Sequence, residues 1–300
     1  MDFEQLNKGV KKIITKAIER YDCLDIYEIK GIFDLLKENQ EISIKNAHDK
    51  LYKDLSVSYL AIAYLGYLSV TVDSIKPFRT DSGWNKNSNF ICSNILTQVT
   101  NFSLSIVKLV EQGLDLQAKV LLRSLFEQVN LIIIITSRKE MMNNYCEGVD
   151  DNSAFSIWSA KFRTNQIKSM ISEIEYDLGL EQDRELFEWL KEDRNKAYKF
   201  LSSVAHGAFY TNLLGSYSMF QDEEYMPFAL FGSYTDASIY TLEQLNWLIY
   251  YLTIMLNAIQ IKVHSFSGPD QCNETYDICK SLEQIFLNTY LRNLNVKERV

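Results

Sequence analysis

The amino-acid sequence predicts an all-α protein, a multi-helix bundle with a buried helical hairpin at its centre. The chain of 300 residues has only 11 Gly and 3 Pro, whereas a β-sandwich or barrel uses these residues in its many turns. Its apolar residues recur near the helical period of about 3.6, most clearly over residues 113–138. Hydrophobic residues make up 47% and charged residues 23%, as in ordinary globular proteins, and the length permits one large domain or two closely packed ones.

Residues 113–138 form the expected central helix. Good helix formers fill the stretch 114–128, and no Pro interrupts it. The run Leu131–Ile135 (LIIII) leaves no polar face, so this half of the helix should be covered on several sides. Because Gly113 alone separates this helix from an expected helix over 90–112, the two should form an antiparallel hairpin.

The remaining elements follow from shorter amphipathic patterns and from the residues that interrupt them. Residues 1–44 form an expected N-terminal helical appendage, and residues 45–300 form the main helical domain. Pro77 and Gly83 mark a loop between two long helices. The other expected helices are 2–20, 24–39, 45–75, 153–178, a charged and solvent-facing 181–193, 236–266 and 273–295.

Composition narrows the setting in which the protein acts. A net charge of −8 gives no global attraction to nucleic acid or to an anionic membrane. The five cysteines are scattered and odd in number, so we expect reduced thiols in a cytoplasmic protein. The N-terminus has no signal-peptide pattern, and the apolar segment Trp247–Ile261 is too short to span a bilayer. We therefore expect no membrane partner.

Several catalytic and cofactor motifs do not occur in the sequence. There is no phosphate-binding glycine loop, no HExxH metal motif and no GxSxG nucleophile elbow. None of the three histidines has a carboxylate three residues before it, and no cysteines cluster. The sequence therefore predicts no metal and no cofactor.

Arg123 and Glu127 are the first candidate functional residues. They are four residues apart on the central helix, so their side chains lie over one another, and Asn130 continues the same face. A buried arginine needs a carboxylate or several carbonyls. The pair is therefore also interpretable as an ion pair within the helix that fixes one packing arrangement.

His206 is the second candidate, because a histidine can act as a general acid or base near neutral pH. Ser202 and Tyr210 lie four residues before and after it, on the same helical face, and Ser203 is adjacent to Ser202. We expect Ser203 and Tyr210, with Asn130, to contribute to substrate binding. A core histidine bonded to Ser202 or to a carbonyl is the alternative interpretation.

The segment LLRSLFEQ (Leu121–Gln128), followed far downstream by SSVAHG (Ser202–Gly207), resembles a bacterial family of uncharacterised all-helical proteins. That family carries an RSLFE-type helix and a later His-Gly. It is similar to the HEPN helical domains, which include toxin and abortive-infection ribonucleases that act as dimers. The resemblance extends over about residues 50–265 and implies a helical effector in bacterial defence or stress response.

By this resemblance, Arg123, Glu127 and His206 match the Arg, Glu and His of the family. The implied activity is metal-independent RNA cleavage: His206 would move the proton of the ribose 2′-hydroxyl, and Arg123 would stabilise the charge on the phosphorane. HEPN ribonucleases place their Arg and His close together on one helix. Here Arg194–Asn195 begins such a pattern, but His206 is twelve residues beyond Arg194.

Two other functions compete with this one. A non-catalytic helical module for binding or oligomerisation is favoured by the acidic charge, the 18 Tyr and the incomplete catalytic motif. A small-molecule or nucleotide sensor would place the same three residues around a pocket. A homodimer, with RNA or a protein as the further partner, is the expected assembly. The sequence leaves open whether the protein is an enzyme.

Overall fold

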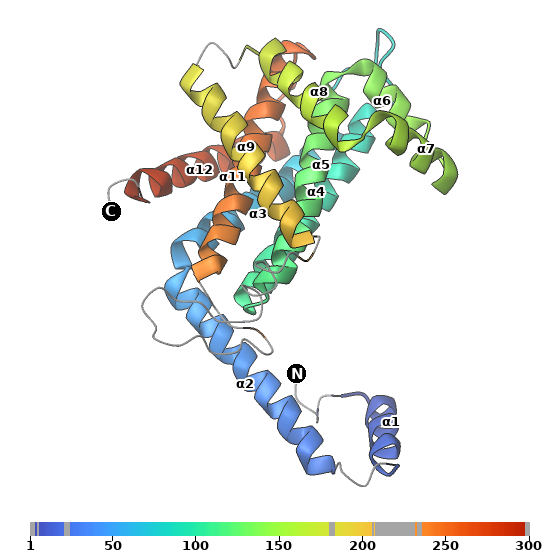
Figure 1. The fold of residues 1–300 in the computed structure, drawn as a ribbon. Helices are drawn as coiled ribbons and strands as arrows, with labels where there is room; N and C mark the ends of the chain where they lie inside the picture. The colour runs from blue at the N-terminus through green and yellow to red at the C-terminus, as the bar shows by residue number, and fades with distance from the viewer. Residues whose placement is uncertain are drawn as a thin grey trace.

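A computed structural model describes residues 4, 6–20, 25–179, 184–205, 207, 232 and 236–297, and within these residues all regular elements are helices. This confirms the predicted all-α class. The helices are α1 (Lys8–Ile18), α2 (Ile26–Lys50), α3 (Tyr52–Ile75), α4 (Ser88–Glu111), α5 (Asp115–Ser137), α6 (Lys139–Cys146), α7 (Asp151–Lys161), α8 (Thr164–Asp177), α9 (Arg184–Ala205), α11 (Asp236–Lys262) and α12 (Glu274–Lys297). Figure 1 shows their arrangement.

Helices α4 and α5 form the predicted hairpin at the centre of the bundle. Gly113 adopts φ 71° between them, a left-handed conformation that other residues take at a cost. Its N–H donates to the Val110 carbonyl at 2.9 Å, and the Leu114 N–H donates to the Leu109 carbonyl at 2.8 Å. This is the Schellman pattern that closes a helix, and it turns the chain back at once into α5.

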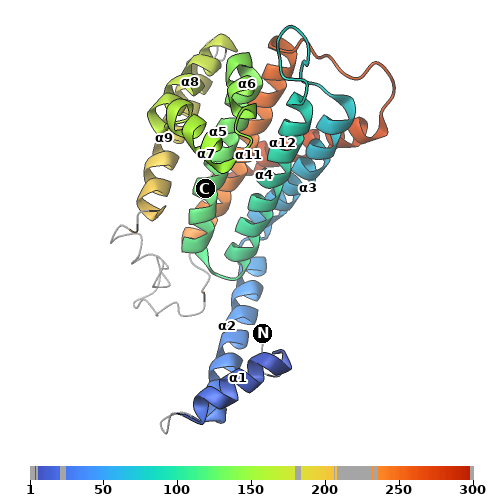
Figure 2. The ribbon, with the colours of Figure 1, turned by 90° about the vertical axis from the view of Figure 1, so that its right-hand side faces the viewer.

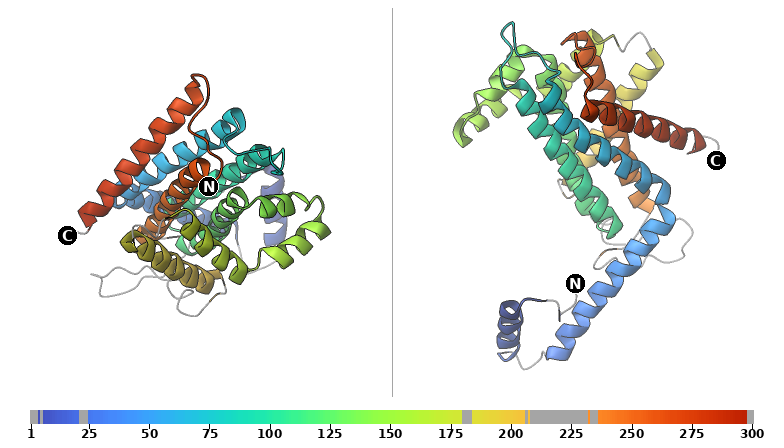
Figure 3. Two further views of the ribbon diagram at one scale, coloured as in Figure 1. Left: turned by 90° about the horizontal axis from the view of Figure 1, so that it is seen from above. Right: turned by 180° about the vertical axis from the view of Figure 1, so that it is seen from behind.

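The second half of α5 is the most deeply buried part of the core. Each residue of Leu131–Ile135 is at most 2% exposed, as the run without a polar face predicts. Helices α4, α11, α8 and α9 all pack against α5, and α3 packs against α4, α11 and α12. Figure 2 and the left panel of Figure 3 show α5 surrounded by these neighbours.

Helices α1 and α2 form an arm that projects from the bundle (Figure 1, and Figure 3, right). Helix α2 is continuous from Ile26 to Lys50, so the expected helix ends at 39 and 45 are wrong. No Gly or Pro lies between residues 32 and 50 to interrupt it, and the chain instead bends at Leu51. Its buried residues are Ser43 and Ala47, near its C-terminal end, where it meets the bundle.

Two further expectations about helix boundaries are corrected. The single helix expected over 153–178 is divided into α7 and α8, because Phe162 is buried and Arg163 is extended between them. Of the charged helix expected over 181–193, the residues that the structure describes, from Arg184 on, form the first part of the longer α9, which continues to Ala205. It does not simply face solvent, because Leu190 is fully buried.

Helices α3, α4 and α5 are each long and apolar enough, by length and composition, to cross a membrane. Between 39% and 61% of their most apolar stretches is buried inside the structure. These three helices meet the length and composition of a membrane-crossing helix, whereas the helix that contains the segment 247–261 does not. The cytoplasmic location and the absence of a membrane partner therefore stay predictions.

A buried polar network ties α8, α9 and α11 together. The Arg194 guanidinium on α9 forms an ion pair with Glu175 on α8, which is 0% exposed. The Tyr251 hydroxyl on α11 donates to the same Glu175 oxygen at 2.7 Å, and Arg194 also donates to Ser172 Oγ at 3.2 Å. Burial first, and then the Glu175 charge, raise the pKa of Tyr251 well above its usual range, so this phenol stays a donor.

His264 joins the loop after α3 to the end of α5. Its Nδ1 accepts a hydrogen bond from the Arg79 backbone N–H at 3.0 Å, and its Nε2 lies 2.7 Å from the Thr136 carbonyl. The second contact requires a hydrogen on Nε2, so the neutral ring satisfies both partners. Phe78 and Trp84 pack against the imidazole at ring-centroid distances of 5.2 and 4.7 Å.

The buried network generates a first prediction. Glu175→Ala leaves the Arg194 charge buried without a carboxylate, which lowers the free energy of unfolding by about 3–5 kcal/mol. Urea denaturation measures the change. The control is Glu192→Ala, which leaves the exposed Lys196 on the same helix without its 2.7 Å partner and should have no measurable effect. Equal effects of the two substitutions would contradict the role of the buried pair.

A second prediction concerns pH. Burial lowers the pKa of His264 below its ordinary 6.5, so the unfolded chain takes up this proton more readily than the folded one. The stability that comes from the neutral imidazole is complete above pH about 6.5 and is lost as the pH falls toward the folded-state pKa. Urea titrations between pH about 7.5 and 5 should give a smaller pH dependence for His264→Gln than for wild type. If the free energy of unfolding depends on pH equally in wild type and in His264→Gln, His264 is not the cause of that dependence.

Candidate functional site

Arg123 and Glu127 pair on α5, as their spacing predicts. The distance from Arg123 Nη2 to Glu127 Oε1 is 2.7 Å. The Arg123 side chain is only 13% exposed, whereas that of Glu127 is 40% exposed. A second layer, formed by α8 and α9, therefore covers the arginine and leaves the carboxylate at the edge of the cover.

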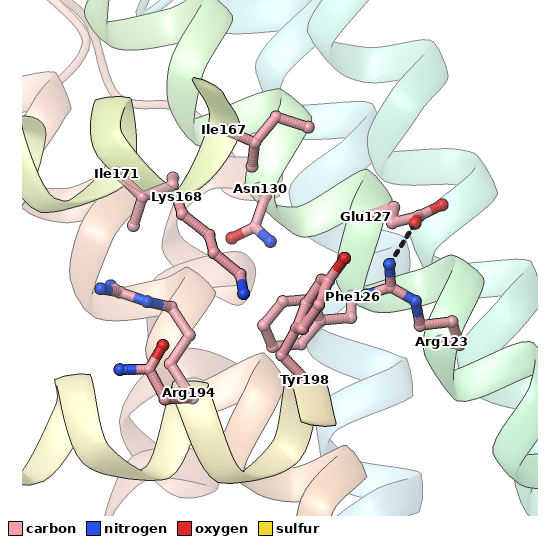
Figure 4. Close-up of a pocket in the computed structure, with 10 residues that line it drawn as sticks. Arg123, Phe126, Glu127, Asn130, Ile167, Lys168, Ile171, Arg194 and Tyr198 are labelled. Carbon is pink, nitrogen blue, oxygen red and sulfur yellow. Dashed lines mark ion pairs between the residues drawn. The ribbon is translucent and has the colours of Figure 1, made fainter. Parts of the chain in front are cut away.

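The Tyr198 ring on α9 lies between two cations. Arg123 Cζ is 4.0 Å from its centroid, and Lys168 Nζ on α8 is 3.9 Å from it. Figure 4 shows the guanidinium and the ammonium on opposite sides of this ring. Phe126 packs edge-to-face against Tyr198, with a ring-centroid distance of 6.1 Å and an interplanar angle of 62°, and this contact supports the Tyr198 ring.

These residues surround a small cleft between α5, α8 and α9. Its volume is about 20 Å³, enough for roughly one water molecule. The residues that line it are Arg123, Phe126, Glu127, Asn130, Ile167, Lys168, Ile171, Arg194, Asn195 and Tyr198.

Two buried polar atoms at the cleft have no protein partner among the described residues. They are Nη1 of Arg123 and Oδ1 of Asn130, whose residue is 4% exposed. Figure 4 shows the Asn130 amide pointing between Lys168 and Phe126, into the cleft. Buried polar atoms are nearly always paired, so an orphaned donor and an orphaned acceptor in one cleft indicate a site for a polar ligand.

The cleft carries an excess of positive charge. Arg123 is offset by Glu127, and Arg194 is directed away from the cleft toward Glu175 (Figure 4). No carboxylate among the described residues lies within ion-pair distance of Lys168. One positive charge is therefore left over, next to aromatic rings.

A larger groove adjoins the cleft and shares Glu127 and Ile167 with it. The groove has a volume of about 690 Å³ and is also lined by Trp158, Ser159, Phe162, Arg163 and Gln166. Trp158 stacks on Phe162 with centroids 5.5 Å apart and an interplanar angle of 20°, and it is 37% exposed. The groove therefore offers an accessible aromatic face and a second arginine beside the cleft.

The structure brings together only part of the predicted site. Arg123, Glu127 and Asn130 converge on the cleft. The Ser203 hydroxyl donates to the Phe200 carbonyl at 2.7 Å within α9, and Ser203 does not line the cleft. His206 and Tyr210 lie outside the described residues, so their expected roles are not placed.

Sequence reasoning missed Lys168 and Tyr198, which complete the cleft. Neither belongs to a motif, and the sequence separation from Arg123 gives no sign of contact. Arg194 was noted only as a possible start of a HEPN pattern. Its burial in an ion pair with Glu175 gives it a structural role instead.

No three His, Cys, Asp or Glu residues in the described part of the chain lie close enough together to hold a metal ion. Comparison with protein-family models, with curated proteins and with solved structures gave no match. The fold and the cleft define an all-α protein with a cationic, aromatic-lined site, and the HEPN resemblance rests on its motifs alone.

The unpartnered amide generates a third prediction. Asn130→Leu removes a buried oxygen that has no donor, so it should raise the free energy of unfolding by about 1 kcal/mol. The matched control is Asn246→Leu, because Asn246 is equally buried but accepts from Ser58 at 2.9 Å and donates to the Asp54 carbonyl at 3.3 Å. The control should lower stability. If both substitutions lower the free energy of unfolding equally in urea denaturation, the Asn130 oxygen is not an unpaired acceptor that is kept for a ligand.

Proposed function

We propose that this chain is a helical effector that binds a phosphate-bearing ligand, single-stranded RNA above all, at the cleft formed by Arg123, Asn130, Lys168 and Tyr198. The observation that carries the proposal is the pair of unpartnered atoms, Arg123 Nη1 and Asn130 Oδ1, in the cleft that Lys168 also lines. The resemblance to HEPN proteins supports RNA as the ligand and defence or stress response as the setting.

The charges of the cleft suit a phosphate group. A guanidinium donates in a fixed fork, and an ammonium supplies three further donors, so Arg123 and Lys168, on opposite faces of the Tyr198 ring, can each hold a phosphate group of the RNA backbone. This local positive charge contrasts with the net charge of −8 on the whole chain. Binding should therefore depend on this one place and be weakened by salt.

The neighbouring groove suits the rest of a nucleotide. Every base has a π-face that can stack on an exposed aromatic ring, and Trp158 offers one. The Asn130 oxygen accepts hydrogen bonds, and the ribose 2′-hydroxyl is a donor that DNA lacks. A cleft and groove of this kind would therefore favour RNA over DNA.

The cleft must open slightly to admit a phosphate. Its volume of about 20 Å³ holds one water molecule. Lys168 and Tyr198 are only half-buried, so a change in their side-chain rotamers enlarges the cleft without moving the core. The proposal requires no rearrangement of the helices.

RNA cleavage is the second candidate, and the orphaned Arg123 Nη1 favours it. A guanidinium N–H that is unpaired in the absence of substrate is suited to stabilise charge that develops on a phosphorane. The base would be His206, as the resemblance implies. Without cleavage, the same cleft would serve an RNA-binding module or a nucleotide sensor, and a homodimer stays the expected assembly.

The binding proposal gives a fourth prediction. Lys168→Ala should weaken binding of a short fluorescein-labelled single-stranded RNA at least about tenfold, since a charged hydrogen bond contributes about 1.5–3 kcal/mol. Fluorescence anisotropy at about 50 and 200 mM salt measures the affinity. Lys196→Ala, on the exposed side of α9, is the control and should bind as wild type does. DNA of the same sequence should bind less tightly.

Absence of RNA binding by the wild type, or an equal loss of affinity in both lysine variants, would contradict the binding proposal.

Cleavage is tested on the same RNA, in EDTA, with wild type, Arg123→Ala and His206→Ala. Products from the wild type alone would support a ribonuclease. Binding without products would leave a binding module or sensor.

A further inference from the structure

Helix α1, at the outer end of the arm, is strongly amphipathic, yet the bundle does not use its apolar side (Figure 1). None of its residues is buried. The apolar residues follow the helical period and therefore share one side, and they are Val10, Ile13, Ile14, Ala17 and Ile18. An amphipathic helix normally covers its apolar side against another surface, so this side is available to a partner.

The protein itself covers the apolar side of α1 only in part. Ile14 and Ile18 are half-buried, whereas Val10 is 43% exposed and Ile13 is 70% exposed. Figure 2 and the right panel of Figure 3 show α1 beside the N-terminal end of α2, at a distance from the bundle. A flat, extended surface can therefore reach α1 without meeting the described part of the bundle.

The opposite side of α1 is basic. Lys8, Lys12 and Lys16 recur at intervals of four residues and share this side, and none of them forms an ion pair with a described residue. Helix α1 contains four lysines and no acidic residue, whereas the whole chain has a net charge of −8. The helix is therefore a local cationic surface on an acidic protein.

The contacts that hold α1 against α2 leave both sides of the helix accessible. Glu4 bridges the two helices, because its carboxylate lies 2.9 Å from Lys11 Nζ on α1 and 3.0 Å from Lys30 Nζ on α2. All three side chains are exposed to solvent, and exposed ion pairs contribute little to stability. Asn7 caps α1 by accepting from the Gly9 N–H at 2.7 Å. The helix can therefore change its angle to α2 at small cost and keep its own fold.

We propose that α1 binds the surface of an anionic lipid bilayer. Its apolar side enters the headgroup region, and its lysines pair with lipid phosphates. A basic polar side, an exposed apolar side and a position at the end of an arm are the properties that suit a helix for a membrane interface. The expectation of no membrane partner rests on the net charge of the whole chain, which includes α1 together with an acidic remainder.

Two other partners explain the observations less completely. A nucleic acid would attract the lysines, but it leaves the exposed Val10 and Ile13 without a role. A second copy of α1 could cover these side chains, but it would bring two lysine-rich helices together, and like charges repel. The membrane contact is also separate from the proposed RNA cleft, which α5, α8 and α9 line.

Vesicle flotation with the full chain tests the partner. The probes are vesicles of phosphatidylcholine alone and of phosphatidylcholine with about 30% phosphatidylglycerol. Wild type should float with the anionic vesicles, less at about 500 mM than at about 100 mM salt, and should not float with the neutral ones. No binding to the anionic vesicles, or equal binding to both, would overturn the proposal.

Variants test the two sides of α1. Ile13→Asp places a charge on the apolar side and should weaken vesicle binding at least about tenfold. Joint replacement of Lys8, Lys12 and Lys16 by Gln should weaken it about a hundredfold, since each lysine near an anionic surface contributes about fivefold. Unchanged vesicle binding in either variant would contradict the proposal.

Matched controls lie outside the arm. Ile261→Asp changes an isoleucine on α11 that is 64% exposed. Joint replacement of Lys86, Lys191 and Lys196 by Gln removes the same amount of charge from exposed positions. Both controls should bind anionic vesicles as wild type does. If the control triple variant loses as much affinity as the α1 triple variant, the binding follows the overall charge of the protein and the proposal fails.

Two further measurements separate the other partners. Sedimentation velocity would reveal a dimer that Ile13→Asp dissociates, and such a dimer without vesicle binding would assign the apolar side to a second copy. Loss of RNA affinity in the α1 triple variant, with vesicle binding retained, would assign the lysines to RNA. Thermal unfolding checks that each variant is folded. The RNA cleft is tested separately by Lys168→Ala, so failure of one proposal does not imply failure of the other.

Discussion

The Glu175–Arg194–Tyr251 network is the interaction on which the arrangement of the helices around the candidate cleft depends. A buried ion pair gains little over an apolar contact of the same shape, but removing one partner is costly, so the network specifies one relative position of α8, α9 and α11. On one side, Arg194 fixes the segment of α9 that carries Tyr198 against α5. On the other side, Tyr251 supports the stacked indole of Trp247.

Helix α9 therefore separates two environments of opposite charge. Tyr198 faces Arg123 and Lys168, whereas Asp193 lines a separate acidic cavity that Glu243 also lines. These positions are five residues apart on one helix, so they lie on different faces. An acidic protein can thus hold a local cationic cleft, because the two sets of charges are kept apart by a helix and by the core beneath it.

Much of the fold could be predicted from the sequence. Helix period and scarce Gly and Pro gave the all-α class, and Gly113 gave the central hairpin, because these signals act over a few residues. The predicted ends of the helices were less accurate than the predicted fold class. The continuity of α2 to Lys50 agrees with the absence of Gly and Pro over residues 32–50, a local sign that the expected boundaries did not use. Nothing local shows that Phe162 is buried and divides the helix expected over 153–178, because that outcome depends on its packing against Tyr145 of α6.

The sequence by itself determined that Arg123 and Glu127 form a pair on the face that Asn130 shares, since a spacing of four residues on a helix permits little else. Only the tertiary structure decided that Lys168 and Tyr198 complete the cleft, that Arg194 is buried with Glu175, and that Trp247 borders an acidic cavity. These contacts join helices that are far apart in sequence. Their geometry follows from how whole apolar faces pack together, which no single segment encodes.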